Sequence, residues 1–489
     1  RSEFWVRLPA VFFGVLALPL AYQLGRLYLG GAPGLIFAAL LATSPFHIRY
    51  SQEVRPYALL VVGVFLAAYG YWRLRRSGTW GYGGLVVGGS LIFSLAHFFG
   101  TVLFVAWGIF AAIDAFILNR QRAPAVKGLL SLIAGGGLVL AILLALGWGE
   151  TFFNVSNRLT ESVAEDNEFT IKVDVQSEQA LAPRVDGMFI RNLVISPLGS
   201  GRGLARTLWV FNGLAGLGLI FLTVRGKYQL LLFLMLWAVV PVALIVTFLV
   251  HRNEFFAPRY IISMLPAYLF VVATGIYAVP YGARRLGLSW IGVIIAAIFV
   301  GLVGREFYTG LQWYYDPGHK EDWRLVAHFL SQNANPENPV IAVNAEATMN
   351  WYYPRAAVPL NAYQNLDQIR AATAGHDRSW VIMSVFTEYL GRQDEMIKAW
   401  LSEKQAIRLE LDPLIAVYYV GDEDSTPEEL LDEIQTFALP VDHALYASLA
   451  RENRRRPAIS EQYFRLAIAH APDEATKAQY EADLAALVR

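Results

Sequence analysis

The sequence contains no cysteine, and charged residues occupy only 16% of its 489 positions. The absence of thiols excludes disulfide bonds, a thiolate nucleophile and a thiolate-bound metal. The shortage of charge, beside a hydrophobic content of 55%, excludes a single soluble domain. This composition is typical of an integral membrane protein that carries a soluble part.

Charge is also unevenly distributed along the chain, although its net value is zero. The long apolar runs lie within residues 1–304, whereas the last third of the chain carries most of the charge. Ten segments of the first part are long or apolar enough to be membrane helices. We place them at residues 8–28, 34–46, 57–72, 83–96, 101–118, 127–147, 207–224, 230–250, 260–279 and 286–304. Because 34–46 and 83–96 are short, one of them could be re-entrant or tilted.

Four connections between these segments contain no acidic residue. Their basic residues are Arg73, Arg75 and Arg76; Arg120, Arg122 and Lys127; Arg225 and Lys227; and Arg284 and Arg285. The positive-inside rule places such connections in the cytoplasm. The other connections, and everything after residue 304, then face outward from a plasma (inner) membrane. Before position 310 only Asp114 is an acid away from the outer side, and we interpret it as a helix-end or packing carboxylate.

This topology puts residues 1–7 outside, yet no translocation signal precedes them and the chain begins with Arg1 rather than Met. We therefore expect at least one further membrane helix upstream of the transmembrane domain assigned to residues 1–304.

The soluble part begins where the composition changes, at Arg305. Aromatic residues in 305–319 are typical of a collar at a membrane surface. A predicted helix at 320–333 is followed by β-rich runs at 339–343, 379–385, 405–410 and 414–420, with helical stretches at 364–374 and 393–403. This alternation predicts an extracytoplasmic α/β domain over 305–425. Residues 426–489 are predicted to be helical and resemble part of a tetratricopeptide unit. No nucleotide-binding loop, zinc-ligand spacing or nucleophile elbow occurs in 305–489.

A polar stretch at 44–57 separates two of the apolar segments. It contains His47, Arg49, Tyr50, Glu53 and Arg55. Charged groups at the point where a helix leaves the bilayer are costly to keep half-desolvated and are often functional. The alternative is an interfacial anchor of arginine and tyrosine.

Further polar residues fall at the same predicted outer rim. His97 interrupts an apolar run, and both a satisfied rim histidine and a ligand or acid/base histidine remain open. The proline before Arg259 indicates that Arg259 and Tyr260 open the next helix, where a guanidinium and backbone N–H groups would bind phosphate. Anchoring to lipid headgroups is the alternative for Arg259. Lys320 is predicted to lie within reach of a headgroup, and Asp322 is a candidate helix cap.

These motifs resemble the family-39-type bacterial glycosyltransferases, relatives of the protein O-mannosyltransferases and of the aminoarabinose transferases that modify lipid A. The most specific piece is Tyr-Ser-Gln-Glu-x-Arg-x-Tyr at 50–57. Similar landmarks are Glu-Phe-Trp-Val-Arg-Leu-Pro-Ala at 3–10, Gly-Arg at 25–26, Ser-Pro-Phe-His at 44–47, His-Phe-Phe-Gly at 97–100, Pro-Arg-Tyr at 258–260 and Lys-Glu-Asp-Trp-Arg at 320–324. The resemblance covers the chain from residue 1 to about residue 330.

The resemblance implies a GT-C fold, a bundle of many membrane helices with a catalytic cleft on the extracytoplasmic side. It implies transfer of a hexose or pentose from a polyprenyl-phosphate donor to a protein, lipid or glycan acceptor, with membrane lipids as partners and no nucleic acid. The expected catalytic base is a carboxylate in a loop before the part matched by residues 1–10, so this chain departs from the pattern there. Among the residues present, Glu53 is the catalytic candidate. The candidates for binding the donor phosphate and sugar are Arg55, Tyr57, His97, Arg259, Tyr260 and Lys320.

The chemistry of such a transfer agrees with these residue types, because it needs a base for the acceptor and positive charge for the departing phosphate. No cofactor is certain, and a divalent-metal requirement stays open because no ligand cluster is evident. A transporter or flippase of lipid-linked sugars and a non-catalytic membrane scaffold are the alternative functions. A transporter would keep ionisable residues near the bilayer midplane and show inverted repeats, and the sequence shows neither.

Overall fold

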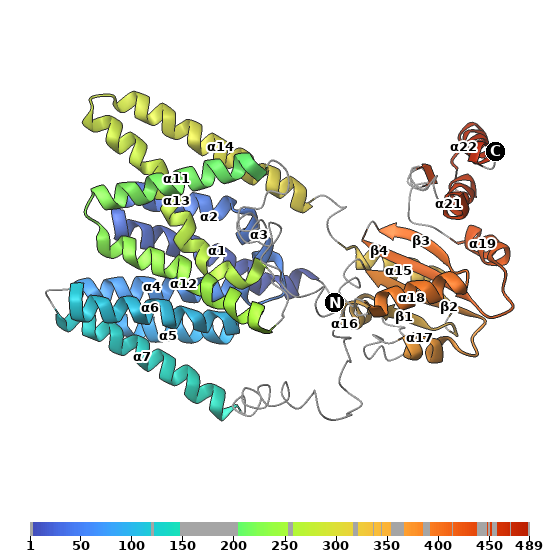
Figure 1. The fold of residues 1–489 in the computed structure, drawn as a ribbon, viewed down its shortest axis with the longest axis horizontal. Helices are drawn as coiled ribbons and strands as arrows, with labels where there is room; N and C mark the ends of the chain where they lie inside the picture. Colours follow the sequence, from blue (N-terminus) through green and yellow to red (C-terminus); the bar gives the residue numbers. More distant parts are fainter. Residues whose placement is uncertain are drawn as a thin grey trace. The chain divides into compact units, whose positions relative to one another are not determined.

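The computed structural model describes residues 3–118, 122–146, 204–252, 258–315, 321–335, 337–343, 345–353, 366–384, 392–412, 414–437, 447, 450–451, 457–469 and 471–487. The chain divides into two compact units, Arg1–Tyr314 and Tyr315–Arg489. The first unit is helical and the second contains a sheet (Figure 1).

The helical unit has the composition of a membrane bundle. Within the described residues, seven helical spans are long and apolar enough to cross a membrane, and a bent pair could provide an eighth. Two shorter apolar helices accompany them. The elements are α1 (Glu3–Leu29), α2 (Gly31–Thr43), α3 (Pro45–Gln52), α4 (Tyr57–Ser77), α5 (Gly81–Ala96), η1 (Phe98–Thr101), α6 (Val102–Ile113), η2 (Asp114–Leu118), α7 (Arg122–Ala145), α11 (Leu204–Val224), α12 (Tyr228–Arg252), η4 (Pro258–Met264), α13 (Leu265–Arg285) and α14 (Ser289–Tyr315). All ten segments predicted from hydropathy therefore have a helical counterpart.

Two boundaries differ from the sequence prediction. The polar stretch after α2 is mostly helical, because α3 continues at an angle of 56° to α2. The last membrane helix, predicted to end at residue 304, continues as α14 to Tyr315. The first eleven residues of the predicted aromatic collar are thus helix.

An aromatic core holds the bundle together. The ring of Phe233 on α12 lies 5.1–6.5 Å from the rings of Tyr28, Tyr71, Trp72, Trp107, Phe110 and Trp237. These rings come from α1, α4, α6 and α12 itself, so one residue connects four helices. Where α11 crosses α13, a Cβ on Gly275 would lie only 1.9 Å from the Leu214 carbonyl oxygen, so the crossing requires glycine. Such small-residue crossings are typical of membrane helices.

The basic connections meet at one end of the bundle. Arg75, at the end of α4, bonds to Asp114 at the start of η2 and to Gln229 at the start of α12. Lys127 near the start of α7 donates to the Gly78 carbonyl after α4. Figure 1 shows the α4–α5, α11–α12 and α13–α14 turns at this same end, opposite to α3. This arrangement fits the predicted topology, whose direction across the membrane stays a prediction.

The second unit is built on a four-stranded sheet of order β1-β2-β4-β3. β1 (Val340–Val343) pairs in parallel with β2 (Arg378–Ser384), and β4 (Ile415–Gly421) pairs antiparallel with both β2 and β3 (Ile407–Asp412). All four predicted strands are confirmed. The helices of this unit are α15 (Trp323–Asn333), α16 (Glu346–Tyr352), α17 (Leu366–Thr373), α18 (Arg392–Glu403), α19 (Pro427–Gln435), α21 (Pro457–Ala469) and α22 (Glu474–Leu487).

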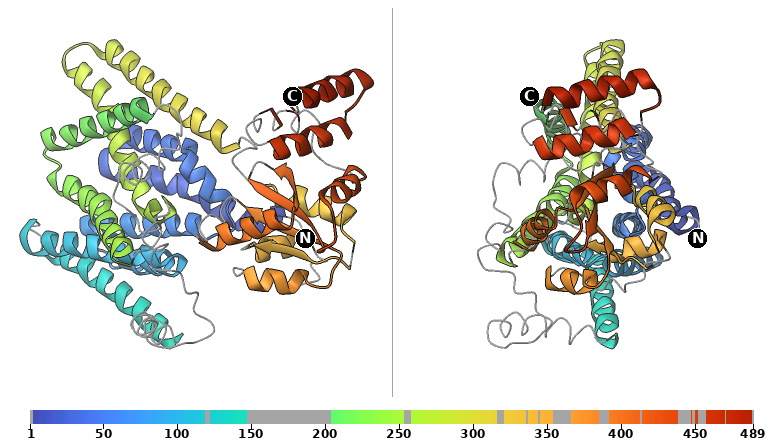
Figure 2. Two further views of the ribbon diagram at one scale, coloured as in Figure 1. Left: turned by 45° about the vertical axis from the view of Figure 1, so that its right-hand side comes forward. Right: turned by 90° about the vertical axis from the view of Figure 1, so that its right-hand side faces the viewer.

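The C-terminal helices share the core of this sheet unit. α21 and α22 lie side by side (Figure 2). Phe464 and Leu466 of α21 are fully buried in the same apolar cluster as Trp380 of β2. The tetratricopeptide-like character of 426–489 and the boundary at 425 stay predictions.

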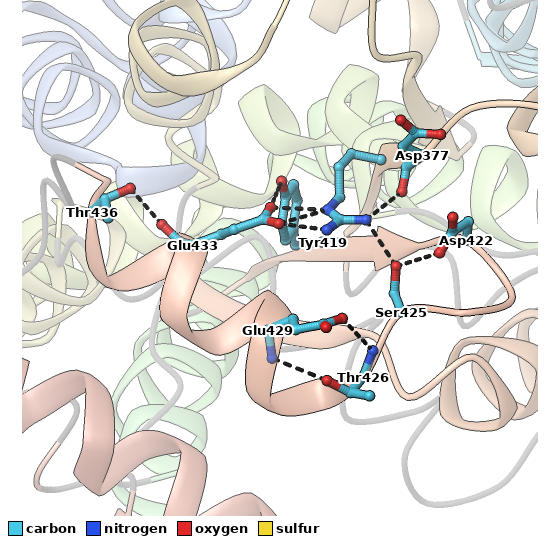
Figure 3. Close-up of polar contacts among 9 residues, drawn as sticks. Asp377, Tyr419, Asp422, Ser425, Thr426, Glu429, Glu433 and Thr436 are labelled. Carbon is cyan, nitrogen blue, oxygen red and sulfur yellow. Dashed lines mark hydrogen bonds and ion pairs between the residues drawn. The ribbon is translucent and has the colours of Figure 1, made fainter.

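A polar network fastens α19 to the sheet. The Arg378 guanidinium donates to the Glu433 carboxylate at 2.5–3.1 Å, and Tyr419 donates to the same carboxylate at 2.6 Å (Figure 3). Arg378 also donates to Ser425, which in turn donates to Asp422. The bonds from Arg378 lower the pKa of Glu433, so the carboxylate is ionised and the network has a structural role.

Candidate functional site

The candidate site begins with the short helix α3. Ser44 is its N-cap, and the Ser44 hydroxyl accepts a hydrogen bond from the His47 amide at 3.4 Å. Pro45 occupies the first helical position, where a missing N–H costs nothing. The helix ends at Gln52, and the chain turns through Glu53–Pro56 into α4.

Helix α3 is fixed against α1 by three contacts. The buried His47 ring donates from Nε2 to the Gly14 carbonyl oxygen at 3.1 Å. A Cβ on Gly14 would lie 2.3 Å from the Ser51 hydroxyl oxygen, so α3 rests directly on the α1 backbone. Arg7 donates to the Gln52 carbonyl oxygen at 3.3 Å, at the negative end of the α3 dipole. His47, one of the polar residues of the stretch at 44–57, thus positions α3 on α1.

Aromatic rings join three separate segments at this end of the bundle. The Tyr50 and Tyr57 ring centres are 5.0 Å apart, and that of His97 lies 5.4 Å from that of Tyr57. Tyr260 of η4 approaches the rings of His97 at 6.0 Å and Phe99 at 4.8 Å. We call Tyr50, Arg55, Tyr57, His97, Arg259 and Tyr260 the rim cluster.

Two guanidinium groups belong to the rim cluster. Arg55 is exposed and forms a side-chain hydrogen bond with Tyr57. The Arg259 guanidinium carbon lies 5.4 Å from the centre of the Tyr260 ring. Partial burial, followed by the charges of Arg259 and Arg55, lowers the pKa of His97. Both cations therefore act on one imidazole, although they come from residues far apart in the chain.

The hydrogen bonding of His97 fixes its tautomer. Its Nδ1 lies 3.2 Å from the Phe99 amide, which can only donate. Nδ1 is therefore the acceptor, and because the lowered pKa keeps the ring neutral at pH 7, its proton is on Nε2. His97 thus caps η1 through one nitrogen and can donate through the other. The rim cap is therefore observed, and the ligand or acid/base role of His97 stays a prediction.

Glu53, the catalytic candidate, pairs with Arg49 at 3.4 Å. Both side chains are partly exposed, at 46% for Arg49 and 28% for Glu53. The Arg49 guanidinium also lies 5.6 Å from the Tyr50 ring and 5.8 Å from the Tyr314 ring at the end of α14. Glu53 therefore lies beside the rim cluster, next to Arg49.

The remaining candidates have other outcomes. Lys320 lies outside the described residues. Asp322 is confirmed as the α15 cap, because its carboxylate accepts from the Arg324 and Leu325 amides at 3.1 Å. Its own amide donates to Asp412, a tertiary partner that the sequence did not indicate. In the part of the chain that the structure describes, no group of three or more His, Asp or Glu side chains is arranged to hold a metal ion.

The contacts that support the rim cluster are tertiary and cannot be predicted from the sequence. Gly14 carried no signal in the sequence, Arg7 appeared only within the landmark at 3–10, and only the N-cap serine and the following proline indicated that 45–52 is helical. Tyr50 was named as part of the polar stretch but not as a neighbour of Tyr57 and His97.

Comparison with known proteins shows which solved structures share the fold. No family model and no curated protein matches the chain. The oligosaccharyltransferase AglB from Archaeoglobus fulgidus, solved with an inhibitory peptide and a dolichol-phosphate, superposes with a TM-score of 0.50 and 12% identity over 99% of this chain and 75% of AglB. ArnT from Cupriavidus metallidurans bound to undecaprenyl phosphate gives 0.48 and 13%, over 87% and 86% of the two chains. Apo ArnT gives 0.49 and 12%, over 84% and 83%.

At these identities the similarity to AglB shows the fold alone. The chain is a multi-pass membrane protein with a GT-C-like helical bundle and a C-terminal α/β region. The predicted likeness to family 39 and to mannosyltransferases in particular stays a prediction.

Proposed function

We propose that this protein is a glycosyltransferase that moves a sugar from a polyprenyl-phosphate donor to a protein, lipid or glycan acceptor at the rim cluster. One observation carries the proposal: Arg55 and Arg259, from distant segments, converge on His97 and its aromatic neighbours. AglB, which shares the fold, is known in complex with a dolichol-phosphate. A polyprenyl phosphate is therefore a ligand compatible with this architecture.

The two guanidinium groups would bind the leaving phosphate. When the bond between the sugar and the phosphate breaks, negative charge develops on the phosphate oxygen. Preorganised cations at that position lower the barrier, because they stabilise the transition state more than the ground state. A phosphate would also compensate the two positive charges, for which no carboxylate partner is found among the described residues.

The neighbouring residues would hold the sugar and the acceptor. We assign Tyr57 and Tyr260 to contacts with the donor, and the Nε2–H of His97 to a hydrogen bond with a donor oxygen. Glu53 is the carboxylate that accompanies these cations, and we assign it to the acceptor proton or to sugar hydroxyl groups. A Glu53→Gln variant separates the two roles: loss of the base lowers kcat with KM for the donor unchanged, whereas loss of a sugar contact raises KM.

A divalent cation has no assigned role in this proposal. Glu53 pairs with Arg49, and the described residues contain no group of three ligating side chains.

The decisive experiment compares Arg259→Ala and Arg259→Lys in the full-length protein. Removing one donor from a preorganised anion site costs roughly a hundredfold in rate, so we expect Arg259→Ala to fold but lose about that factor in transfer. Arg259→Lys should recover only part, because an ammonium cannot replace the planar guanidinium fork. Arg305→Ala, which removes an exposed arginine of α14, is the matched control.

The assay measures both the glycosylated acceptor and the polyprenyl phosphate released from the donor. Near-normal rates in both Arg259 variants would remove Arg259 from the site. Movement of an intact donor across the membrane, without release of polyprenyl phosphate, would instead identify the protein as a flippase.

A further inference from the structure

A second cluster of cations lies at the opposite end of the bundle, where α11 and α13 finish. Arg225 and Lys227 follow the last turn of α11, and Arg284 and Arg285 form the last turn of α13. All four side chains belong to exposed residues. The positive-inside rule explains why cations lie here but not how they are arranged.

The arrangement centres on a single tyrosine. The Arg225 guanidinium carbon lies 4.9 Å from the centre of the Tyr281 ring, and that of Arg285 lies 5.2 Å from it. Phe221 packs edge-on against the same ring at 5.3 Å. Two like charges are thus gathered around one aromatic side chain.

These cations differ from Arg73, Arg75 and Lys127 at the same end. Arg75 is paired with Asp114, Arg73 donates to the Tyr82 hydroxyl, and Lys127 donates to a backbone carbonyl. In contrast, within the described part of the chain, Arg225, Lys227, Arg284 and Arg285 form no ion pair and donate no side-chain hydrogen bond. Each guanidinium is stabilised by its contact with the Tyr281 ring, and an anion bound beside the two would also offset their mutual repulsion.

The surroundings show what kind of anion would fit. Immediately beside the cations, α11 exposes Ile220 at 61% and Val224 at 79%, and the α13–α14 turn exposes Leu286 at 76%. Trp290, at the start of α14, is 68% exposed. Cations and a tryptophan above exposed aliphatic side chains match an anionic headgroup with acyl chains below it.

We propose that Arg225, Tyr281 and Arg285 form a binding site for an anionic glycerophospholipid, with its phosphate between the two guanidinium groups and its acyl chains along Ile220 and Val224. Arg284 and Lys227 add general attraction but do not define the site. This site is separate from the rim cluster and does not depend on the proposed transfer activity.

The test counts lipids retained by the purified full-length protein in native mass spectrometry. The protein is exchanged from detergent into mixed phosphatidylglycerol and phosphatidylcholine, and the retained ratio is compared between variants. A hydrogen bond between a guanidinium and a phosphate is worth about tenfold in affinity, so Arg285→Gln should lower phosphatidylglycerol retention about tenfold and Arg225→Gln/Arg285→Gln about a hundredfold. Phosphatidylcholine retention should not change.

Arg284→Gln is the matched control, because it removes the same charge from the same turn without touching Tyr281. Tyr281→Leu should also weaken retention, whereas Arg284→Gln should leave most of it. Equal losses for Arg284→Gln and Arg285→Gln would overturn the proposal in favour of diffuse attraction. Absence of any preference for phosphatidylglycerol in the unaltered protein, or full displacement by millimolar inorganic phosphate, would overturn it as well.

Discussion

Arg75, at the basic end of the helical bundle, and the two arginines of the rim cluster have different surroundings. At the basic end, Arg75 forms two hydrogen bonds to Asp114, at 2.6 and 2.9 Å, and Asp114 is fully buried. At the rim, Arg55 and Arg259 lie beside tyrosine rings and have no carboxylate partner among the described residues. A buried arginine with its own carboxylate serves the fold, whereas a pair of cations that share no carboxylate is suited to an anion from outside the chain.

The largest effect on the stability of the protein is expected at Asp114. Replacing it with alanine leaves the Arg75 guanidinium inside the bundle without its counterion, and breaking a buried pair in this way costs about 3–5 kcal/mol. We therefore expect Asp114→Ala to lower the thermal unfolding temperature strongly in detergent. By contrast, Arg49→Gln, which breaks the partly exposed pair with Glu53, should cost at most about 1 kcal/mol.

The double variant Asp114→Ala/Arg75→Met tests whether the loss of stability comes from the unpaired charge of Arg75. Because it removes both charges, it should recover much of the lost stability. If Asp114→Ala were as stable as the unaltered protein, the pair would not be structural, and the distinction between Arg75 and the rim arginines would fail.

An intermediate effect is predicted where the rim is attached to the bundle. Gly14→Ala would place a methyl group against Ser51, and overpacking of this kind typically costs about 1–3 kcal/mol. Because α3 leads directly into Arg55 and Tyr57, transfer activity should fall together with the stability.

Two further variants separate the contact from a general glycine effect. Gly14→Ala/Ser51→Gly should restore both stability and activity. Gly84→Ala on α5, where no atom would contact the new Cβ, should be neutral or slightly stabilising. Thermal unfolding and turnover of the four proteins check this, and an unchanged Gly14→Ala protein would mean that α3 is not held by this contact.

The comparison also shows what a single sequence can predict. Each of the ten segments predicted from hydropathy has a helical counterpart among the described residues, and β-rich runs located the four strands of the sheet, because both signals are local in the chain. The pairing of Arg75 with Asp114 was not predictable, since the partners are 39 residues apart and only tertiary packing brings them together. For Asp114, the expected packing role was right, but its partner was not identified.

The sequence indicated which residues lie at the candidate site better than it indicated how they are arranged. The rim position of Arg55, Tyr57, His97 and Arg259 followed from topology and from the family resemblance. The helical form of 45–52 was missed because its charged side chains indicated a loop, although Ser44 and Pro45 are strong helix-start residues. The contact of Glu53 with Arg49 follows from this helix, which places the two side chains one turn apart.

The smallest predicted effect concerns His97, whose two nitrogens have different tasks. Asparagine can retain the Nδ1 acceptor that caps η1, whereas glutamine can reach the Nε2 position and donate there. If His97 contacts the donor, His97→Gln should keep most of the transfer activity and His97→Asn should lose about fivefold, the value of one neutral hydrogen bond.

Protonation provides an independent check. Because the pKa of His97 is lowered in the folded protein, folding favours the neutral ring, so the stability contributed by this group declines as the pH falls below about 6.5, the ordinary histidine pKa. Thermal unfolding between pH 7.5 and 5 should therefore show a smaller acid-induced loss of stability in His97→Gln than in the unaltered protein. The transfer rates of His97→Gln and His97→Asn at pH 7.5 test the roles of the two ring nitrogens. Normal activity in His97→Asn together with low activity in His97→Gln would make His97 a structural cap only, and the donor contact at the rim would then rest on Arg55 and Arg259.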